Sequence, residues 1–257
     1  MPRFAANLTL LWNEVPFLDR FALAADHGFK AVEFMFPYDY DTAQIRERLA
    51  AHSLELVLHN LPAGNWDVGE RGIACHPGRI REFQEGVARA VEHALALGAR
   101  QLNCLAGKAP PGVPEAGVRQ TLVKNLRHAA AELHKHGLRL LVEPINTHDI
   151  PGFYLNRTAQ AASILDEVGS ANVFILYDVY HAQRMEGELA ATLQKHLPRI
   201  GHVQIADNPG RNEPGTGEIN YSFLLRHLDR IGYDGWVGCE YKPLAGTAAG
   251  LGWRAEI

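Results

Sequence analysis

Short apolar runs recur along the whole chain, and most are followed by a segment in which apolar residues are spaced three or four apart. The runs cover residues 4–8, 31–36, 54–58, 100–105, 140–142, 173–177, 202–206 and 236–240. Runs of this length bounded by glycine or proline suit strands that are covered on both faces, and the spacing between them is typical of amphipathic helices. The pattern therefore predicts eight successive units of a strand and a helix.

Units of about 30 residues, each with a strand and a crossover helix, produce a parallel sheet. Eight of them fit an α/β fold of the (β/α)₈ TIM barrel type, and we expect residues 1–257 to form one such domain. The main alternative is an open doubly wound sheet. When such a sheet binds nucleotides, a glycine fingerprint follows its first strand, and here that position reads Leu8-Thr9-Leu10-Leu11.

Four of the later runs end on, or next to, a side chain with a ligand oxygen. Glu143 precedes Pro144, which cannot continue a strand ladder, and Asp178, Gln204 and Glu240 occupy similar places. One such carboxylate could equally be solvated or face a helix N-terminus. Because the carboxyl ends of barrel strands meet at one face, however, four in succession predict a common site.

Three carboxylates packed closely would repel one another unless they were protonated or bound to a cation. A divalent metal ion resolves this conflict. If Gln204 uses its amide carbonyl, all the ligands are oxygen atoms, which favours Mg²⁺ or Mn²⁺ over zinc. With Glu143 and Glu240 on either side of a chelated substrate, one carboxylate could remove a proton and the other return it at the adjacent carbon. Isomerisation of a ketone to an aldehyde and epimerisation at one carbon would use the same groups.

Two further side chains near the same strand ends suit a small acidic substrate. His181 follows Asp178 by three residues and could contact a substrate oxygen. Arg211 lies in the loop after the seventh run, and its guanidinium could hold a carboxylate through two hydrogen bonds or form a surface salt bridge. His59 and His202 are weaker candidates.

A loop at about residues 61–79 is long for a compact domain and carries several glycines and prolines. Trp66 and the charged turn at residues 69–72 favour a lid over a flexible linker. The three cysteines, Cys75, Cys104 and Cys239, have no paired spacing, so we expect reduced, buried thiols.

The formal net charge is −4, and lysine and arginine are scattered, which argues against nucleic acid as a partner. The sequence shows no signal-like or membrane-spanning apolar segment. We therefore expect a soluble, cytoplasmic protein acting on a small molecule, without a membrane partner. The prediction leaves room for a homo-oligomer.

Several longer motifs resemble hydroxypyruvate isomerases, which belong to the xylose isomerase-like TIM barrel superfamily. They are LVEPIN (141–146), YDVYHAQRMEGE (177–188), GHVQIADNPGRNEPGTGEINY (201–221) and GWVGCEYKP (235–243), with FMFPYDYD (34–41), HNLPAGNWDVGERGIA (59–74) and NCLAGK (103–108). The resemblance covers essentially the full length of the chain.

This resemblance implies an isomerase that interconverts hydroxypyruvate and 2-hydroxy-3-oxopropanoate (tartronate semialdehyde), an enzyme of glyoxylate and carbohydrate metabolism. It implies Glu143 and Glu240 as the acid/base pair and contacts with a hydroxy-keto acid substrate from further side chains. The implied metal ligands are Glu143, Asp178, Gln204 and Glu240, and the implied substrate contacts are His181, Arg211, His59 and Lys242.

Several alternatives remain open at this point. A sister group acts on 2-oxo-tetronates, and related sugar epimerases carry histidine where this chain has Gln204. A noncatalytic barrel that binds sugar acids and a metal-dependent DNA-repair nuclease share the scaffold. The scattered basic residues count against the nuclease.

Overall fold

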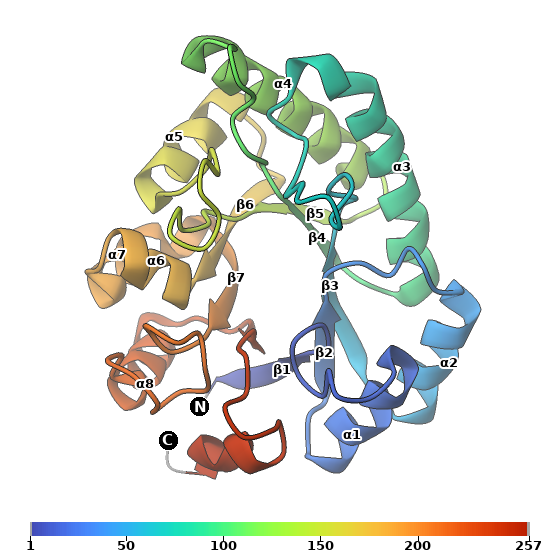
Figure 1. The fold of residues 1–257 in the computed structure, drawn as a ribbon, viewed down its shortest axis with the longest axis vertical. Helices are drawn as coiled ribbons and strands as arrows, with labels where there is room; N and C mark the ends of the chain where they lie inside the picture. Colours follow the sequence, from blue (N-terminus) through green and yellow to red (C-terminus); the bar gives the residue numbers. More distant parts are fainter. Residues whose placement is uncertain (1, 256–257) are drawn as a thin grey trace.

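Strands that are neighbours in the sequence pair in parallel all the way round a closed barrel (Figure 1). The computed structural model describes residues 2–255, and within that range eight strands run from β1 (Arg3–Asn7) to β8 (Trp236–Cys239). β1 pairs with both β2 and β8, which closes the sheet. The predicted single-domain (β/α)₈ barrel is confirmed, and the open sheet is excluded.

The six other strands agree with the predicted runs to within a few residues at each end. Glu143 and Glu240 lie directly after β5 and β8, Asp178 is the last residue of β6, and Gln204 lies near the end of β7. Proline at position 144 offers no N–H to a ladder, which fits the end of β5 beside it. The strands are β2 (Ala31–Phe34), β3 (Glu55–Asn60), β4 (Gln101–Cys104), β5 (Arg139–Val142), β6 (Val173–Asp178) and β7 (Ile200–Ile205).

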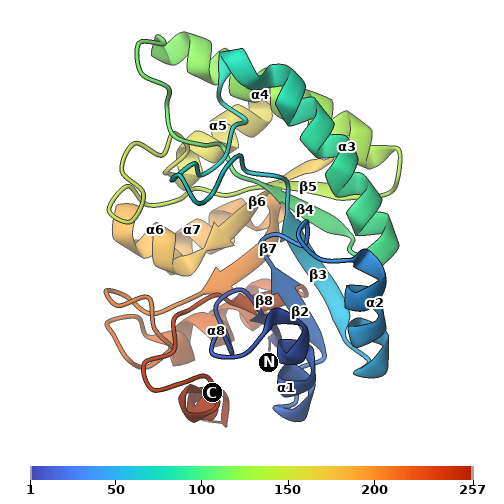
Figure 2. The same ribbon diagram turned by 45° about the vertical axis from the view of Figure 1, so that its right-hand side comes forward.

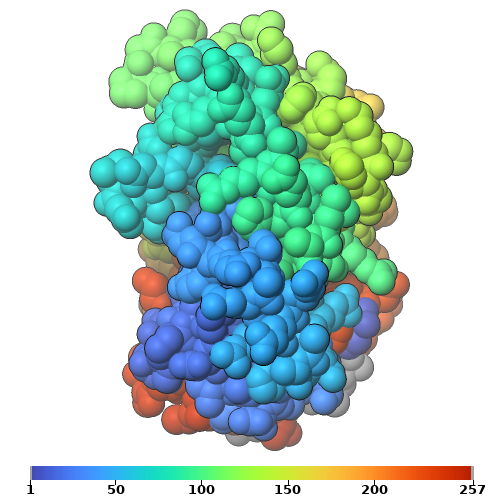
Figure 3. All heavy atoms as spheres, turned by 90° about the vertical axis from the view of Figure 1, so that its right-hand side faces the viewer, coloured from blue at the N-terminus to red at the C-terminus, as the bar shows by residue number. Residues whose placement is uncertain are grey.

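Helices cover the outside of the barrel (Figure 2). Figure 3 shows the face of the molecule on the side of α2 and α3, and residues from the first half of the chain form most of that face. The α-helices are α1 (Arg20–Asp26), α2 (Thr42–Ala51), α3 (Ile80–Leu97), α4 (Glu115–His134), α5 (Thr158–Val168), α6 (Val179–Met185), α7 (Leu189–His196) and α8 (Tyr221–Ile231), and the 3₁₀ helices are η1 (Phe17–Asp19), η2 (Pro77–Arg79), η3 (Leu197–Arg199) and η4 (Ala249–Ala255).

Three of these helices, α6, η2 and η4, were not predicted from the sequence; η2 lies within the predicted loop at residues 61–79. α6 spans seven residues, which is too short for helical periodicity to stand out. Longer helices follow their pattern closely. In α3 the buried residues recur at helical spacing, and the helix ends at Gly98 in the left-handed conformation (φ 76°).

The interior of the barrel has an apolar layer beneath a polar one. The apolar layer includes Ala5, Ala31, Val57, Leu141 and Leu176. Since side chains on a strand alternate between faces, residues two positions further along point into the same interior, nearer the carboxyl ends of the strands. The eight positions of this upper layer, one for each strand, are all polar and all buried: Asn7, Glu33, His59, Asn103, Glu143, Asp178, Gln204 and Glu240.

The loop that begins at residue 61 is held against the segment that follows β4. The backbone N–H of Leu61 donates to the carbonyl of Asn103 (2.8 Å), and Lys108 Nζ donates to the carbonyl of Gly69 (3.0 Å). Gly72 forms an isolated antiparallel bridge with Ala106. The loop thus has a defined position beside β3 and β4.

Gly72 is required for this close approach, and its replacement by alanine should destabilise the protein by about 2–3 kcal/mol. Its φ is 113°, and a Cβ would lie 2.7 Å from the carbonyl carbon of Leu105. Chemical unfolding curves measure the effect. Gly69→Ala is the matched control, because Gly69 also has a positive φ (89°) but open space around its Cα. Equal losses for the two variants would contradict the steric explanation.

η4 packs against β1, with the ring of Trp253 edge-on to that of Phe4 at a centroid distance of 5.1 Å. All three cysteines are buried and free of disulfide bonds, as predicted. Among residues 2–255, no helix is both long and apolar enough to cross a membrane.

Candidate active site and metal centre

Glu143 and Asp178 lie side by side at the ends of β5 and β6, and each is held through one oxygen. Glu143 Oε2 accepts a hydrogen bond from Asn103 Nδ2 (2.9 Å). Asp178 Oδ1 accepts from the backbone N–H groups of Tyr180 (2.7 Å) and His181 (3.2 Å), and so caps the N-terminus of α6. The second oxygen of each carboxylate lies within 4 Å of a nitrogen atom of His181.

Gln204 is the register partner of Asp178 on β7, and Arg211 Nη2 lies near both Asp178 Oδ2 (3.9 Å) and Glu240 Oε1. Gln204 Nε2 donates to Glu240 Oε2 (2.5 Å) and to Glu33 Oε1 (2.7 Å). Glu240 also accepts from Asn7 Nδ2 at Oε2 (3.0 Å) and from Arg211 Nη2 at Oε1 (2.7 Å). The four side chains predicted at the strand ends therefore lie within one buried network.

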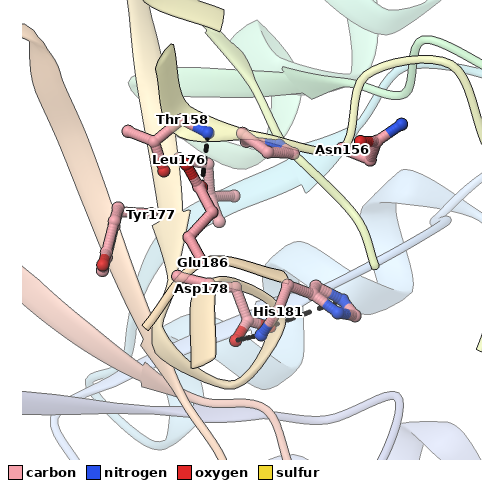
Figure 4. A pocket seen from close by; sticks show the side chains of 9 residues that line it. Asn156, Thr158, Leu176, Tyr177, Asp178, His181 and Glu186 are labelled. Atoms are coloured by element: carbon pink, nitrogen blue, oxygen red, sulfur yellow. Dashed lines mark hydrogen bonds and ion pairs between the residues drawn. The ribbon is translucent and has the colours of Figure 1, made fainter. Parts of the chain in front are cut away.

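His181 lies in the first turn of α6, beside Asp178 (Figure 4). Its Nε2 is 3.6 Å from Glu143 Oε1 and 3.7 Å from Asp178 Oδ2. Its Nδ1 is 2.6 Å from Asn146 Nδ2, and Asn146 is oriented by Asp149, whose backbone N–H donates to Asn146 Oδ1. Because Nδ1 then accepts, the hydrogen of the neutral ring lies on Nε2, which makes that atom a donor toward the mouth.

Burial makes this collection of carboxylates costly to ionise. It raises the pKa of Glu143 to about 8, and the nearby Asp178 adds to the shift. The pKa values of Asp178 and Glu240 are also raised, first by burial, although Arg211 opposes the shift in both. Burial and then Arg211 and Arg184 hold the pKa of His181 well below its usual value, so the ring is neutral. A further positive charge would be needed to ionise all three carboxyl groups.

The free atoms of the network fit a divalent cation. Asp178 Oδ2 and Gln204 Oε1 are buried, and neither has a hydrogen-bond partner in the part of the chain that the structure describes. Glu143, Asp178 and His181 offer potential ligand atoms within 4.8 Å of one another. Buried acceptors without donors are rare unless an ion or water satisfies them. Because Nε2 of His181 carries a hydrogen, the oxygen atoms are the better ligands, which favours a hard ion.

Without such a cation, the free energy of unfolding should fall by on the order of 2 kcal/mol between about pH 5 and pH 8. The pKa of Glu143 is about 8 in the folded protein and 4.5 as its ordinary value, so the folded state retains the proton longer. That contribution is fully present below the ordinary pKa and is lost as pH rises through the folded one. Urea unfolding in a chelator measures it. Glu143→Gln should show a shallower decline, and identical profiles would contradict the assignment.

The other sequence-predicted residues occupy three different settings. Arg211 is mostly buried and contacts Glu240, which excludes a simple surface salt bridge. His59 is fully buried, and its Nδ1 lies 3.1 Å from the Asn60 carbonyl, while its Nε2 has no partner among residues 2–255. Burial lowers the pKa of His59 to about 4. Lys242 is exposed, and its backbone N–H donates to the Arg211 carbonyl (2.7 Å).

Four buried polar residues that support the site were missed from the sequence. Three of them lie within apolar runs, as Glu33 does between Val32 and Phe34, and the fourth lies in the loop after β5. A charged residue inside a buried strand was the available signal. The supporting residues that the sequence analysis left out are Asn7, Glu33, Asn103 and Asn146.

A family model described as xylose isomerase-like TIM barrel matches residues 21–257. The chain belongs to this family. The hydroxypyruvate isomerase of Escherichia coli is 56% identical to it over 253 residues, which cover 98% of each protein. The 2-oxo-tetronate isomerase of Cupriavidus necator is 48% identical over 98% of this chain and 97% of its own length.

The xylose isomerase-like barrel is also found in solved structures of high similarity. A crystal structure from Brucella melitensis, described as an AP endonuclease of family 2, has a TM-score of 0.97 and 46% identity, and covers 100% of this chain and 99% of that one. The 3-keto-D-glucoside 4-epimerase of E. coli has a TM-score of 0.83 at 21% identity, over the full length of both chains. That second likeness concerns the fold alone.

Proposed function

We propose that this protein is a metal-assisted isomerase that interconverts hydroxypyruvate and 2-hydroxy-3-oxopropanoate. The observation that carries the proposal is the group of three buried carboxyl groups at the barrel mouth, in which Asp178 Oδ2 and the neighbouring Gln204 Oε1 have no hydrogen-bond partner among residues 2–255. The relative named hydroxypyruvate isomerase, which matches nearly the full length, supports the same activity. We expect it to act in the cytoplasm.

The proposed ligands are Glu143, Asp178, Gln204 and Glu240, with Mg²⁺ or Mn²⁺ as the ion. When bound, such an ion polarises adjacent substrate oxygens and makes the neighbouring C–H more acidic. It would also offset the burial and the repulsion from Asp178 that raise the pKa of Glu143, so that Glu143 could be ionised near neutral pH.

Glu143 and Glu240 are the proposed proton-transfer pair. One carboxylate removes a proton from C3 of hydroxypyruvate, which leaves an enediolate. The O3 hydroxyl proton passes to O2, and the other carboxylate delivers a proton to C2. The ketone has then become an alcohol and the primary alcohol an aldehyde, with no net gain or loss of electrons. Asn103 fixes one oxygen of Glu143. Asn7 and Gln204 do the same for Glu240.

The remaining side chains are proposed to bind the substrate. Arg211, which contacts Glu240 and lies 3.9 Å from Asp178 Oδ2, would hold the substrate carboxylate. His181 Nε2 would donate to a substrate oxygen, and His59 Nε2, as a neutral acceptor, would receive a substrate hydroxyl. Lys242 remains a weaker candidate because its side chain is exposed. The loop at residues 61–79 would act as the lid that limits access of water.

A substrate longer by one carbon is the first alternative, because a 2-oxo-tetronate isomerase is 48% identical to this chain. Protein reconstituted with Mn²⁺ should be assayed by NMR against hydroxypyruvate and 2-oxo-tetronates in parallel. A higher kcat/KM for hydroxypyruvate is the expected result. A clear preference for the longer acid would reassign the substrate, and no turnover of either would refute the isomerase.

A nuclease is the second alternative, because one similar structure is described as an AP endonuclease. The net charge of −4 does not favour binding to a phosphate backbone. Incubation with a duplex that contains an abasic site should give no cleavage with either Mg²⁺ or Mn²⁺. Strand scission at the abasic site would instead support the nuclease.

A further inference from the structure

Glu33 is a fully buried carboxylate within β2, in the polar layer of the barrel interior. Asn7 Nδ2 (3.0 Å) and Gln204 Nε2 (2.7 Å) both donate to its Oε1. His202 Nε2 lies 2.7 Å from its Oε2. Its neighbours therefore engage both oxygens through groups that donate hydrogen bonds.

This arrangement decides which end of the Gln204 side chain is free. The amide group has a donor end, Nε2, and an acceptor end, Oε1, of nearly equal size. Nε2 uses its two hydrogens on Glu33 and Glu240, both of which can only accept when ionised. Oε1 is consequently turned away from them, and it is buried with no partner among the described residues. A rotated amide would place N–H groups where the proposed ion needs an oxygen.

A glycine on β8 leaves the space that the side chain of Glu33 occupies. Gly238 is the register partner of Gln204, and a Cβ on it would lie 2.6 Å from the carboxyl carbon of Glu33. The backbone of Gly238 thus leaves the space that the carboxylate occupies. Glu33, Gly238 and Gln204 form a spatial unit assembled from β2, β8 and β7.

We infer that Glu33 is a positioning residue that presents the carbonyl oxygen of Gln204 to the divalent ion. This inference rests on the proposed metal site, and it explains how a glutamine can serve as a ligand with a defined orientation. Glu33 touches neither substrate nor ion in this account. It acts through the orientation of one amide group, as supporting hydrogen bonds do in metal sites generally.

Glu33→Gln tests the inference with little change of shape. The introduced amide cannot accept from Asn7, Gln204 and His202 together, so the orientation of Gln204 is held less firmly and depends more on Glu240. The dissociation constant for Mn²⁺, measured by EPR titration of the free ion, should rise by about 10- to 100-fold. Gly238→Ala should raise the dissociation constant as well, because the added methyl group displaces Glu33 without altering the charge of Glu33. Melting curves without metal would show that each variant is folded.

The charge of Glu33 could also attract the cation directly, and a double-mutant cycle separates the two effects. If Glu33 acts through Gln204, Glu33→Gln should cause little further loss of Mn²⁺ affinity in the Gln204→Ala background. An equal loss in both backgrounds, or unchanged affinity in Glu33→Gln, would overturn the inference. Isomerase activity is not part of the readout. Tight Mn²⁺ binding without turnover would therefore refute the proposed function and leave the role of Glu33 standing.

Discussion

Glu143→Gln should reduce kcat/KM for hydroxypyruvate by at least ~10³-fold while the barrel remains folded. The substitution keeps the shape of the side chain and its contact with Asn103, but it removes the proposed base and one charge from the metal centre. Steady-state kinetics at saturating Mn²⁺ measure the loss. Circular dichroism and melting curves report on the fold.

Glu167→Gln is the control for this variant. Glu167 also forms a charged contact, with Arg119, but it lies on α5 outside the barrel. Its replacement should change kcat/KM less than about twofold, because exposed ion pairs contribute little. Near-normal turnover of Glu143→Gln would refute the proposed mechanism.

Arg211→Lys should raise KM for hydroxypyruvate by about 10- to 100-fold, with a smaller effect on kcat. Lysine keeps the positive charge beside Glu240 and Asp178 but cannot form two parallel hydrogen bonds to a carboxylate. The kinetics should be repeated with dihydroxyacetone, which carries a hydroxymethyl group in place of the carboxylate. That neutral substrate should be equally poor for the wild type and the variant.

Arg184→Lys provides the matched comparison for Arg211. Both guanidinium groups lie over the ring of Tyr180, at 5.6 Å and 5.4 Å, but Arg184 contacts the Pro209 carbonyl rather than Glu240. KM should therefore change little in Arg184→Lys. If Arg211→Lys weakened activity on the neutral and the acidic substrate alike, Arg211 would be a support for Glu240 and not a carboxylate clamp.

The barrel could be predicted from the sequence because strands buried on both faces leave a strong signal. A continuous apolar run such as residues 173–177 reads as such a strand, and the glycine after α3 marks where the helix ends. The short helix α6 was missed. It begins directly after β6 because the side chain of Asp178 caps it, and capping at a strand end does not alter the hydrophobic pattern.

The four side chains at the strand ends were predictable for the same reason, since Glu143, Asp178, Gln204 and Glu240 interrupt or end apolar runs. The hydrogen bonds that hold these side chains were not predictable. Contact between Gln204 and Glu33 joins residues 171 positions apart, and it depends on the closure and register of the barrel. Likewise, the tautomer of His181 follows from its contact with Asn146, which Asp149 orients. The spacing of hydrophobic residues gives no sign of these contacts.

Conversion of hydroxypyruvate in D₂O, followed by NMR at early times, tests the proton-transfer mechanism most directly. One carboxylate of the proposed pair removes the C3 proton, and the other delivers a deuteron that it has taken from the solvent. The first 2-hydroxy-3-oxopropanoate formed should therefore carry deuterium at C2. The rate should depend on both Glu143 and Glu240, and a reaction without protein corrects for spontaneous exchange. Product that retains the substrate hydrogen at C2, with no deuterium from solvent, would indicate a hydride shift and contradict the account.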